Sequence, residues 1–409
     1  TAYITTNEPL GRVLILDLAD GKLLKEIRVG HTPTSPTLSD DGRLLCIANR
    51  FNNSVTLLDL ANATRETVEV IREPIAMALS RDGTRLFVGN HLPCVRPFLD
   101  DENPYISVEI SVIDTRQHRL IGNIELPNGS QGIRGLALSP DGKFVLATHV
   151  LSHYTIPTAK IEGGAMNMNA VSLIDAESMQ WVESIMLDDP EMGAANPWAI
   201  GFDGEGDRLL VTHAGTHELS VIDYPALIAR IERERGADGL YDESDLTTMQ
   251  GIRQRVQLPV AGPRTFCEIA GKVYIPGYFS DDLAVVDLQE PASPVRRIVL
   301  ENPVNISAER MGEQYFNDAS LCCRQWQSCA TCHPDGRSDA LYWDLLNDGV
   351  GNTKNTKSLL MSTMTPPLMW RGVREDASAA IRAGIHHIQF TEPKEGQAEA
   401  IEAYLAAMQ

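Results

Sequence analysis

The sequence predicts a mostly β fold, a β-propeller of six or seven blades, followed by a small α-helical domain. Three observations lead to this prediction. Tight turns rich in Asp and Gly recur along the first three hundred residues, strands that end in Leu-Asp or Ile-Asp recur with them, and a Cys-x-x-Cys-His motif follows near residue 330. We expect the propeller at residues 1–302 and the helical domain at residues 303–409.

Each repeat of the first part combines a turn, an apolar strand, a polar loop and a second strand. An Asp-Gly turn between β-rich segments indicates a hairpin, and four-stranded units that repeat about every forty residues indicate a propeller. The repeats resemble those of YVTN-repeat propellers, with Cys46–Asn49 and Phe87–Asn90 at the name-giving position. The turns lie at Ser39–Arg43, Ser80–Thr84, Ser139–Lys143 and Phe202–Asp207.

The repeats give a count of six blades. The first unit covers Tyr3–Val29, and the next ones begin near Pro33, Pro74, Ile133, Pro197 and Pro263. A count of seven stays open because the first unit lacks its innermost strand. Insertions are expected at about 91–107, 150–169 and 224–257, and the helical periodicity of Tyr224–Arg233 predicts a surface helix in the last of them.

The motif Cys329-Ala330-Thr331-Cys332-His333 predicts one covalently bound haem of the c type, so that the second domain is a c-type cytochrome domain. The two intervening residues place both sulfurs along one haem edge, and the adjacent His333 then ligates the iron. The alternative is a redox-active or zinc-binding cysteine pair followed by a chance histidine. Zinc, however, would need two further ligands at suitable spacing.

A second axial ligand is expected in the methionine-rich segment downstream, where Pro366 and Pro367 prevent a helix. Residues 305–409 resemble the haem domains of bacterial cytochrome c peroxidases and of the MauG group, and this resemblance implies that Met369 is the ligand. Met361, Met364, His386 and His387 remain alternatives. The resemblance rests on Glu309–Phe316, Cys329–His333 and Thr365–Met369. Those peroxidases carry two haems whereas this chain has one Cys-x-x-Cys-His motif, so peroxidase activity does not follow.

Composition narrows the environment and the partners. The net charge of −20 disfavours nucleic acid, and it favours a basic electron-transfer protein as the external partner. No run of about 18 apolar residues is present, so no membrane span is expected. Haem attachment of this type is completed outside the cytoplasm in bacteria, and no secretory signal precedes Thr1. We therefore expect a processed protein in the periplasm or another extracytoplasmic compartment.

Several histidines recur at equivalent blade positions and predict a second site. His149 and His213 replace Asn49 and Asn90 of earlier blades, and each is followed four residues later by another histidine, His153 or His217. Blade geometry places these residues, with His91, at one mouth of the propeller channel. Imidazole is the commonest metal-ligating side chain, so we expect copper, iron or zinc there. The alternative is that these histidines form hydrogen bonds between blades or line a polar channel.

Three classes of function follow. In the first, the protein is an oxidoreductase whose propeller mouth binds a small-molecule or peptide substrate while the haem exchanges electrons with the external partner. His149 and His213 then act at the substrate, and Arg264 binds its anionic group unless it pairs with blade carboxylates instead. In the second, the chain is a non-catalytic electron carrier whose propeller is a docking or binding scaffold. In the third, it is a cell-surface binding protein with a structural or sensory haem.

Overall fold

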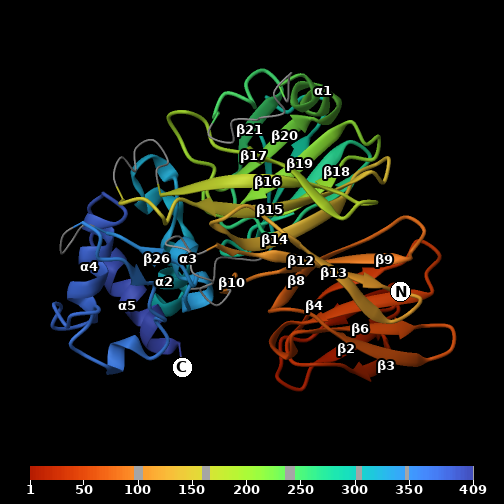
Figure 1. Cartoon of the computed structure of the whole chain (residues 1–409), viewed down its shortest axis with the longest axis horizontal. Coiled ribbons are helices and arrows are strands. Elements are labelled where there is room, and N and C mark those ends of the chain that lie inside the picture. The colour runs from red at the N-terminus through yellow and green to blue at the C-terminus, as the bar shows by residue number, and fades with distance from the viewer. Residues whose placement is uncertain (96–104, 159–165, 235–244, 301–305, 346–349, 409) are drawn as a thin grey trace. The chain divides into compact units, whose positions relative to one another are not determined.

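The computed structural model describes residues 1–95, 105–158, 166–234, 245–300, 306–345 and 350–408. Six β-sheets follow one another along the chain as the blades of a six-bladed β-propeller, and a helical region follows them (Figure 1). The predicted fold class is therefore confirmed, with six blades rather than seven. The predicted domain boundary at residue 302 lies outside the described residues.

The first three blades contain eleven strands. Blade 1 has three strands in the order β1-β2-β3, blade 2 has the order β4-β5-β6-β7, and blade 3 has the order β13-β12-β9-β8. The expectation that the first unit lacks its innermost strand agrees with this sheet of three strands among the described residues. The strands are β1 (Ala2–Thr5), β2 (Arg12–Leu16), β3 (Leu23–Arg28), β4 (Pro33–Leu38), β5 (Leu44–Asn49), β6 (Ser54–Asp59), β7 (Thr64–Glu69), β8 (Pro74–Leu79), β9 (Arg85–Asn90), β12 (Glu109–Asp114) and β13 (Arg119–Glu125).

Blades 4 to 6 are four-stranded and antiparallel, and each keeps its strands in chain order. Their strands are β14 (Ser130–Leu138), β15 (Phe144–Ser152), β16 (Asn167–Asp175), β17 (Gln180–Met186), β18 (Pro197–Phe202), β19 (Arg208–His213), β20 (Glu218–Asp223), β21 (Arg253–Gln257), β22 (Cys267–Ile269), β23 (Lys272–Pro276), β24 (Asp282–Asp287) and β25 (Arg296–Val299). The predicted surface helix is confirmed as α1 (Tyr224–Glu234), between β20 and β21. A short ribbon of β10 (Cys94–Val95) and β11 (Ile106–Ser107) lies in the insertion of blade 3.

The repeated turns have one construction. In blade 2 the Ser39 hydroxyl donates to Asp41 Oδ1 at 2.6 Å, and the Gly42 N–H donates to the Ser39 carbonyl at 2.8 Å. Gly42 has a φ of +69°, a value that only glycine adopts without cost. The same contacts recur at Ser80 and Ser139. The Asp-Gly pattern therefore fixes where each hairpin reverses, and with it which strand end carries the residues that precede a polar loop.

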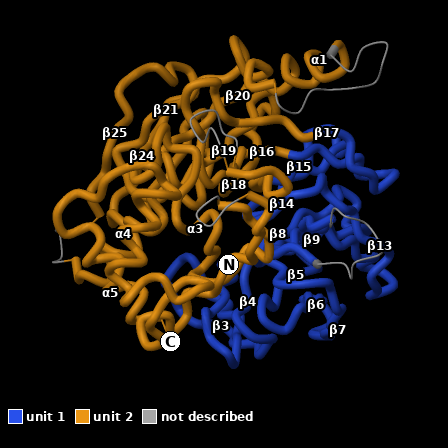
Figure 2. The backbone as a smooth tube through the Cα atoms, turned by 60° about the vertical axis from the view of Figure 1, so that its left-hand side comes forward, with its two compact units in different colours: residues 1–148, 172–183 blue, residues 149–171, 184–409 orange. Residues whose placement is uncertain are grey.

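The chain forms two compact units, residues 1–148 with 172–183 and residues 149–171 with 184–409 (Figure 2). The first unit has its core between successive blades, where Cys46, Val55, Leu86 and Val88 are fully buried together. The second unit has a comparable core between blades 5 and 6. This second unit also contains the C-terminal domain, by which we mean residues 306–408. No helix among the described residues has the length and hydropathy required to cross a membrane.

The C-terminal domain is built on two crossing helices, α2 (Ala308–Asn317) and α5 (Gln397–Ala407). Gly312 lies at the crossing, where an added Cβ would be 1.8 Å from the Ala400 carbonyl oxygen. Phe316 packs edge-on against Tyr404 with 5.4 Å between ring centroids. The remaining elements are α3 (Cys329–Cys332), α4 (Ala377–His387), the strand pair β26 (Tyr342–Trp343) and β27 (Lys354–Asn355), and 3₁₀ turns at Ala319–Leu321, Cys323–Gln325, Pro334–Gly336 and Ser362–Met364.

The crossing predicts the effect of a single methyl group. We expect Gly312→Ala to destabilise the C-terminal domain by about 1–3 kcal/mol or more, because the new Cβ overlaps a backbone carbonyl that cannot move without separating the helices. Unfolding by denaturant, followed by circular dichroism, measures the change. Gly384→Ala is the matched control, because a Cβ at this position of α4 meets nothing within 4 Å. Equal stability of the two variants would contradict the crossing.

Candidate functional site

The Cys-x-x-Cys-His motif forms a single helical turn. Cys329 and Cys332 are the first and last residues of α3, and the Ser328 and Thr331 side chains form a reciprocal capping box at its start. Burial raises the pKa of Cys329 to about 11 and holds the pKa of Cys332 well above its usual range, so both thiols are neutral. The turn brings both sulfurs to one side of a short rigid element, as attachment along one haem edge requires.

His333 has the orientation of an axial ligand. Its Nδ1–H donates to the carbonyls of Lys357 at 3.0 Å and Arg337 at 3.3 Å, so that Nε2 is the nitrogen available to iron. Desolvation lowers the pKa of His333 and keeps the imidazole neutral, which is the form that ligates metal. The residues present therefore fit a c-type haem at Cys329, Cys332 and His333.

Three asparagines of the propeller bind the attachment segment, and Asn167 and Asn169 are fully buried. Asn167, at the start of β16, donates to Gln327 Oε1 at 2.6 Å, and its amide nitrogen is 3.8 Å from Cys332 Sγ. Asn169 donates to the Trp326 carbonyl at 3.2 Å. Asn196 donates to the Ser328 hydroxyl at 2.7 Å and accepts from the Thr331 hydroxyl at 2.8 Å. The turn that would carry the haem is thus held by propeller side chains.

Charged side chains hold the loop that carries Asn196 through hydrogen bonds and an ion pair. Asp188 is fully buried and accepts from the Asn169 amide at 2.9 Å and the Ala194 N–H at 2.7 Å; desolvation nevertheless raises its pKa to about 6. Arg255 of β21 bonds Asp189 at 2.8 Å and the Gly193 carbonyl at 2.7 Å. These contacts bring Gly193 so close to the C-terminal domain that a Cβ there would be 2.4 Å from Trp326 Cα.

Met369 lies at the corner of a tight turn. The Gly372 N–H donates to the Met369 carbonyl at 3.1 Å, and Leu368 and Arg374 pair in an antiparallel bridge behind it. Met369 has a φ of +70° and is 37% exposed. The segment after Pro367 is thus a tight turn and not the extended loop that the sequence predicts, because the Leu368–Arg374 bridge closes it. The assignment of Met369 as iron ligand stays a prediction.

The alternative ligands are exposed in the structure. Met361 is 50% and Met364 is 70% exposed. His386 forms an ion pair with Glu392 on the surface, and its ring lies edge-on to that of His387. His386 Nδ1 is therefore engaged by a surface carboxylate, and the choice among Met369, Met361, Met364, His386 and His387 stays a prediction.

His213 has a structural role in its blade. Its Nδ1–H donates to the Ala194 carbonyl at 2.8 Å, and its Nε2 accepts from the Ser220 hydroxyl at 2.8 Å. Asn49 and Asn90 form the equivalent bond in earlier blades, to Thr56 at 2.8 Å and to Ser111 at 3.1 Å. In all three blades the hydroxyl lies two residues beyond the cross-strand partner. The histidine thus replaces asparagine in a repeated inter-strand bond, and both its nitrogens are occupied.

The other predicted metal ligands also contact protein atoms. His149 and His91 are fully buried and direct Nδ1 at the carbonyls of Val150 and Ile133, each at 3.2 Å. His217 accepts from the Gly262 N–H at 3.0 Å, and its Nε2 is 3.5 Å from Asp318 Oδ2. His153 is half-buried at the end of blade 4.

These positions bear on the predicted second metal. Within the described ranges, no three His, Cys, Asp or Glu side chains gather as a metal-binding group. The geometry therefore favours the alternative interpretation, in which the histidines form hydrogen bonds within and between blades.

Arg264 lies in an aromatic cage. Its guanidinium carbon is 3.7 Å from the ring centroid of Tyr278 and 4.4 Å from that of Trp198. Nη2 donates to Asn317 Oδ1 of α2 at 3.2 Å, and desolvation lowers the pKa of the guanidinium. The cation–π contacts join Arg264 to blades 5 and 6, and the hydrogen bond to Asn317 joins it to the C-terminal domain. The predicted pairing of Arg264 with an anionic substrate stays a prediction.

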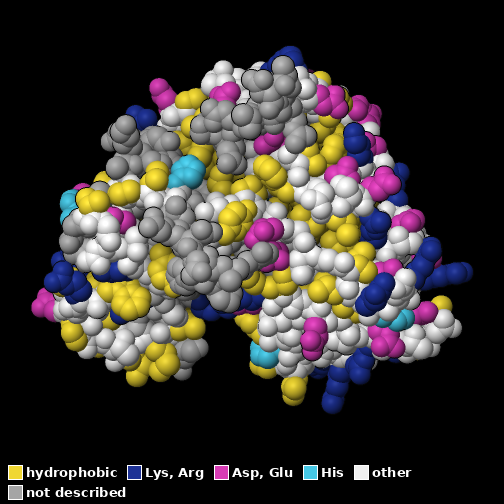
Figure 3. Space-filling model, viewed as in Figure 1, with side chains coloured by type: hydrophobic (Ala, Val, Ile, Leu, Met, Phe, Trp, Pro, Cys, Tyr) yellow, Lys and Arg dark blue, Asp and Glu magenta, His cyan; other side chains and the backbone are white. Residues whose placement is uncertain are grey.

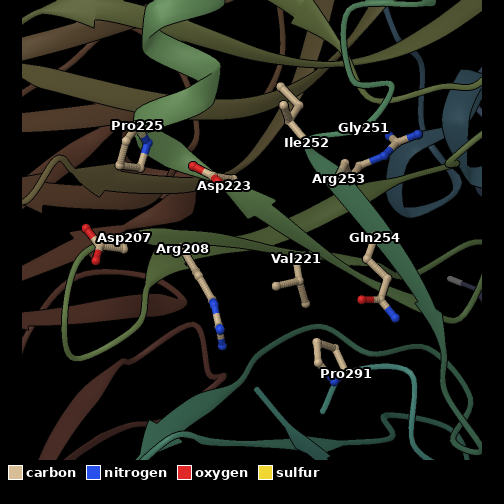
Figure 4. A pocket seen from close by; sticks show the side chains of 10 residues that line it. All are labelled: Asp207, Arg208, Val221, Asp223, Pro225, Gly251, Ile252, Arg253, Gln254 and Pro291. Atoms are coloured by element: carbon tan, nitrogen blue, oxygen red, sulfur yellow. The ribbon is translucent and has the colours of Figure 1, made fainter. Parts of the chain in front are cut away.

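A cavity of 590 Å³ lies elsewhere in the second unit, and Figure 4 shows the side chains around it. It is lined by Asp207, Arg208 and Asp223 of blade 5 together with Pro291 of the last blade. Arg208 and His213 are the two ends of β19, about 16 Å apart at the rise of an extended strand. The cavity is therefore at the end of the blade opposite to His213, and none of the predicted site residues lines it.

Comparison with known proteins supports the assignment of the C-terminal domain. Residues 307–409 match the family model for di-haem cytochrome c peroxidase. The C-terminal domain thus resembles this haem family, as the sequence predicted. The match does not include the propeller. The number of haems is indicated only by the sequence, which has one Cys-x-x-Cys-His motif.

Two curated relatives are subunits of one enzyme of Kuenenia stuttgartiensis. Hydrazine synthase subunit beta is 24% identical over 183 residues, which are 44% of this chain and 47% of that subunit. Hydrazine synthase subunit gamma is 36% identical over 75 residues, which are 18% of this chain and 21% of that subunit. The matched parts therefore span less than half the length of either relative.

Solved structures include propellers of similar fold. The β-propeller domain of Cps50 (Swd1) from Myceliophteria thermophila aligns with a TM-score of 0.50 at 16% identity, over 74% of this chain and 83% of that one. A chain of Kuenenia stuttgartiensis hydrazine synthase aligns with a TM-score of 0.48 at 20% identity, over 69% of this chain and 94% of that one. The first of these likenesses supports the propeller fold alone.

The asparagines that hold the attachment turn are absent from the sequence prediction. Asn167 and Asn196 contact residues 160 and 135 positions away, respectively. Asparagine is a common loop residue, so its spacing carries no signal for such distant partners. The sequence offers one hint. Asn167 and Asn169 stand at the start of β16, and the corresponding strands of the other blades begin with other residues.

The burial of His213 predicts a pH dependence of stability. Desolvation lowers its pKa to about 3, far below the 6.5 of an unfolded histidine, so the unfolded state binds more protons between these values. Stability is therefore fully present above pH 6.5 and is lost as the pH falls toward 3. We expect His213→Asn, which restores the asparagine of earlier blades, to reduce the slope by up to about 1.4 kcal/mol per pH unit in unfolding titrations. The exposed His118→Asn is the control, and equal slopes would contradict the assignment.

The hydrogen bonds of the propeller histidines predict the metal content of the protein. We expect elemental analysis of the haem-loaded protein to find one iron per chain and no further copper, iron or zinc, because His213 and His217 each use both nitrogens on protein partners. The His149→Ala, His213→Ala double variant should keep that ratio. A second metal in the wild type that is lost in the double variant would restore the sequence-based hypothesis.

Proposed function

We propose that this protein is an extracytoplasmic haem oxidoreductase whose C-terminal domain exchanges electrons with an external protein. The observation that carries the proposal is the His333 ring, which two backbone carbonyls hold through Nδ1 next to a capped Cys-x-x-Cys turn. The family match of residues 307–409 supports the same conclusion. When bound, the haem supplies a one-electron redox centre; this chain supplies its attachment, orientation and surroundings.

In this proposal the propeller is a support for the haem domain. Asn167, Asn169 and Asn196 engage the attachment segment, and Arg264 engages α2. Contacts of this kind fix the orientation of the attachment turn, because buried hydrogen bonds are costly to leave unmade. The predicted His149 and His213 mouth is therefore not where we place the chemistry; the haem and its immediate surroundings are.

The relatives suggest a substrate class. Parts of this chain resemble the beta and gamma subunits of one hydrazine synthase. We propose small nitrogen compounds such as hydrazine or hydroxylamine as the first substrates to test. The second candidate function is a non-catalytic electron carrier, which the exposed Met369 turn also supports.

The experiment combines spectroscopy with turnover. We expect the haem-loaded wild type to have the spectrum of a low-spin, six-coordinate haem. We expect Met369→Ala to lose that spectrum and to lower the reduction potential, because a thioether ligand favours ferrous iron. Met364→Ala, which removes a more exposed methionine of the same segment, is the control and should leave both unchanged.

Turnover then separates the two candidate functions. Oxidation of hydrazine or hydroxylamine with a one-electron acceptor, at rates that the Met369→Ala variant alters, would support the oxidoreductase. Fast haem reduction by an external protein without turnover of either compound would leave the electron carrier. A haem that small-molecule reductants cannot reduce would contradict both.

A further inference from the structure

One segment of the C-terminal domain has a charge opposite to that of the chain. Residues 354–374 contain Lys354, Lys357, Arg371 and Arg374 and no Asp or Glu, whereas the whole chain has a net charge of −20. We call these residues the basic segment. Lys357 and Arg371 are exposed, and Lys354 and Arg374 are half-buried.

The basic segment is connected to both predicted axial ligands. The Lys357 carbonyl accepts from Nδ1 of His333 at 3.0 Å, so this lysine adjoins the proximal side of the haem site. Arg371 lies two residues beyond Met369, within the turn that the Gly372 to Met369 hydrogen bond closes. If His333 and Met369 both hold the iron, residues of the basic segment therefore adjoin both ligands.

Trp370 joins the two halves of the segment. Its indole Nε1–H donates to the Asn355 carbonyl at 2.8 Å, and the Lys357 ammonium is 4.6 Å from its ring centroid. These contacts bring the strand end at residues 354–357 and the Met369 turn together on one surface. The basic side chains of both halves therefore belong to the same patch.

Apolar side chains are exposed between these charges. Trp370 is 54% and Val373 is 58% exposed. In Figure 3, hydrophobic side chains and Lys or Arg side chains lie next to one another over the C-terminal domain, at the left of the view. Exposed Glu375 and Asp376 directly follow Arg374, so the basic segment ends there. Within residues 354–374, exposed apolar side chains next to basic ones are typical of a surface that another protein covers.

We propose that the surface formed by Lys354, Lys357, Trp370, Arg371 and Arg374 is the docking site for an acidic electron-transfer protein. This inference rests on the proposed function and names the partner of the same haem. The charge of the whole chain favours a basic partner, but the screening length is about 8 Å at physiological ionic strength. Charges in the contact therefore decide the docked complex, and here they are basic.

The test measures electron transfer between the haem-loaded full chain and two probe proteins, flavodoxin as an acidic carrier and a basic cytochrome c. Stopped-flow rates are recorded over a range of ionic strengths. For flavodoxin we expect a rate that falls as salt is added, because the attraction between opposite charges is screened. The Lys357→Glu, Arg371→Glu double variant should be about tenfold slower at low salt.

A matched variant controls for total charge. Lys25→Glu, Lys394→Glu changes the net charge by the same amount at exposed lysines of β3 and of the segment after α4. Its rate with flavodoxin should stay within about twofold of the wild type, since long-range charge is screened. Equal slowing of both double variants would overturn the proposal, because total charge rather than this surface would then control the rate.

Three further outcomes would also overturn it. A flavodoxin rate that does not depend on salt would show that charge attraction does not guide the docking. A wild-type rate with the basic cytochrome c that falls as salt is added, and that the Lys357→Glu, Arg371→Glu variant leaves unchanged, would show a partner that docks at another, acidic surface. A wild-type dimer in sedimentation that the same variant dissociates would assign the surface to a second copy of this chain. Reduction of each variant by dithionite keeps these results separate from the proposed function, since a haem that dithionite cannot reduce contradicts that function instead.

Discussion

The hydrogen bonds from Asn167, Asn169 and Asn196 to the attachment segment are the constraint on which the rest of the site depends. The three side-chain amides donate hydrogen bonds to the segment between Trp326 and Thr331, and two of the three asparagines are fully buried. A buried amide whose partner is removed costs about 1–3 kcal/mol, so the propeller and the turn hold each other in one arrangement. Asp188 and Arg255 position the loop from which Asn196 reaches this turn.

Burial makes the propeller histidines and the histidine of the haem motif neutral, but their hydrogen bonds differ. His149 and His213 are fully buried, and desolvation lowers their pKa values to about 4 and about 3, so both rings are neutral hydrogen-bonding groups. His333 is neutral for the same reason, but both of its hydrogen bonds are formed by Nδ1. His213 differs from His333 because its Nε2 also accepts a hydrogen bond, from the Ser220 hydroxyl, so that both of its nitrogens have protein partners.

The propeller binds the C-terminal domain, a role that its sequence repeats do not indicate. Blades 5 and 6 contribute Asn196, His217 and Arg264, and all three contact the C-terminal domain of the same compact unit. These contacts hold the C-terminal domain against blades 5 and 6. They support our proposal that the propeller is a support for the haem domain.

The sequence by itself determined the features whose cause is local. Asp-Gly turns place each hairpin because only glycine adopts the required positive φ, and the Cys-x-x-Cys-His spacing places two sulfurs and an imidazole on one helical turn. The helix at Tyr224–Glu234 likewise follows from periodicity. Only the tertiary structure decided that His213 repeats the bond of Asn49 and Asn90, that Arg264 lies in an aromatic cage, and that distant asparagines hold the attachment turn. These depend on which residues the fold brings together or on which nitrogen is already occupied, and residue type and spacing carry neither.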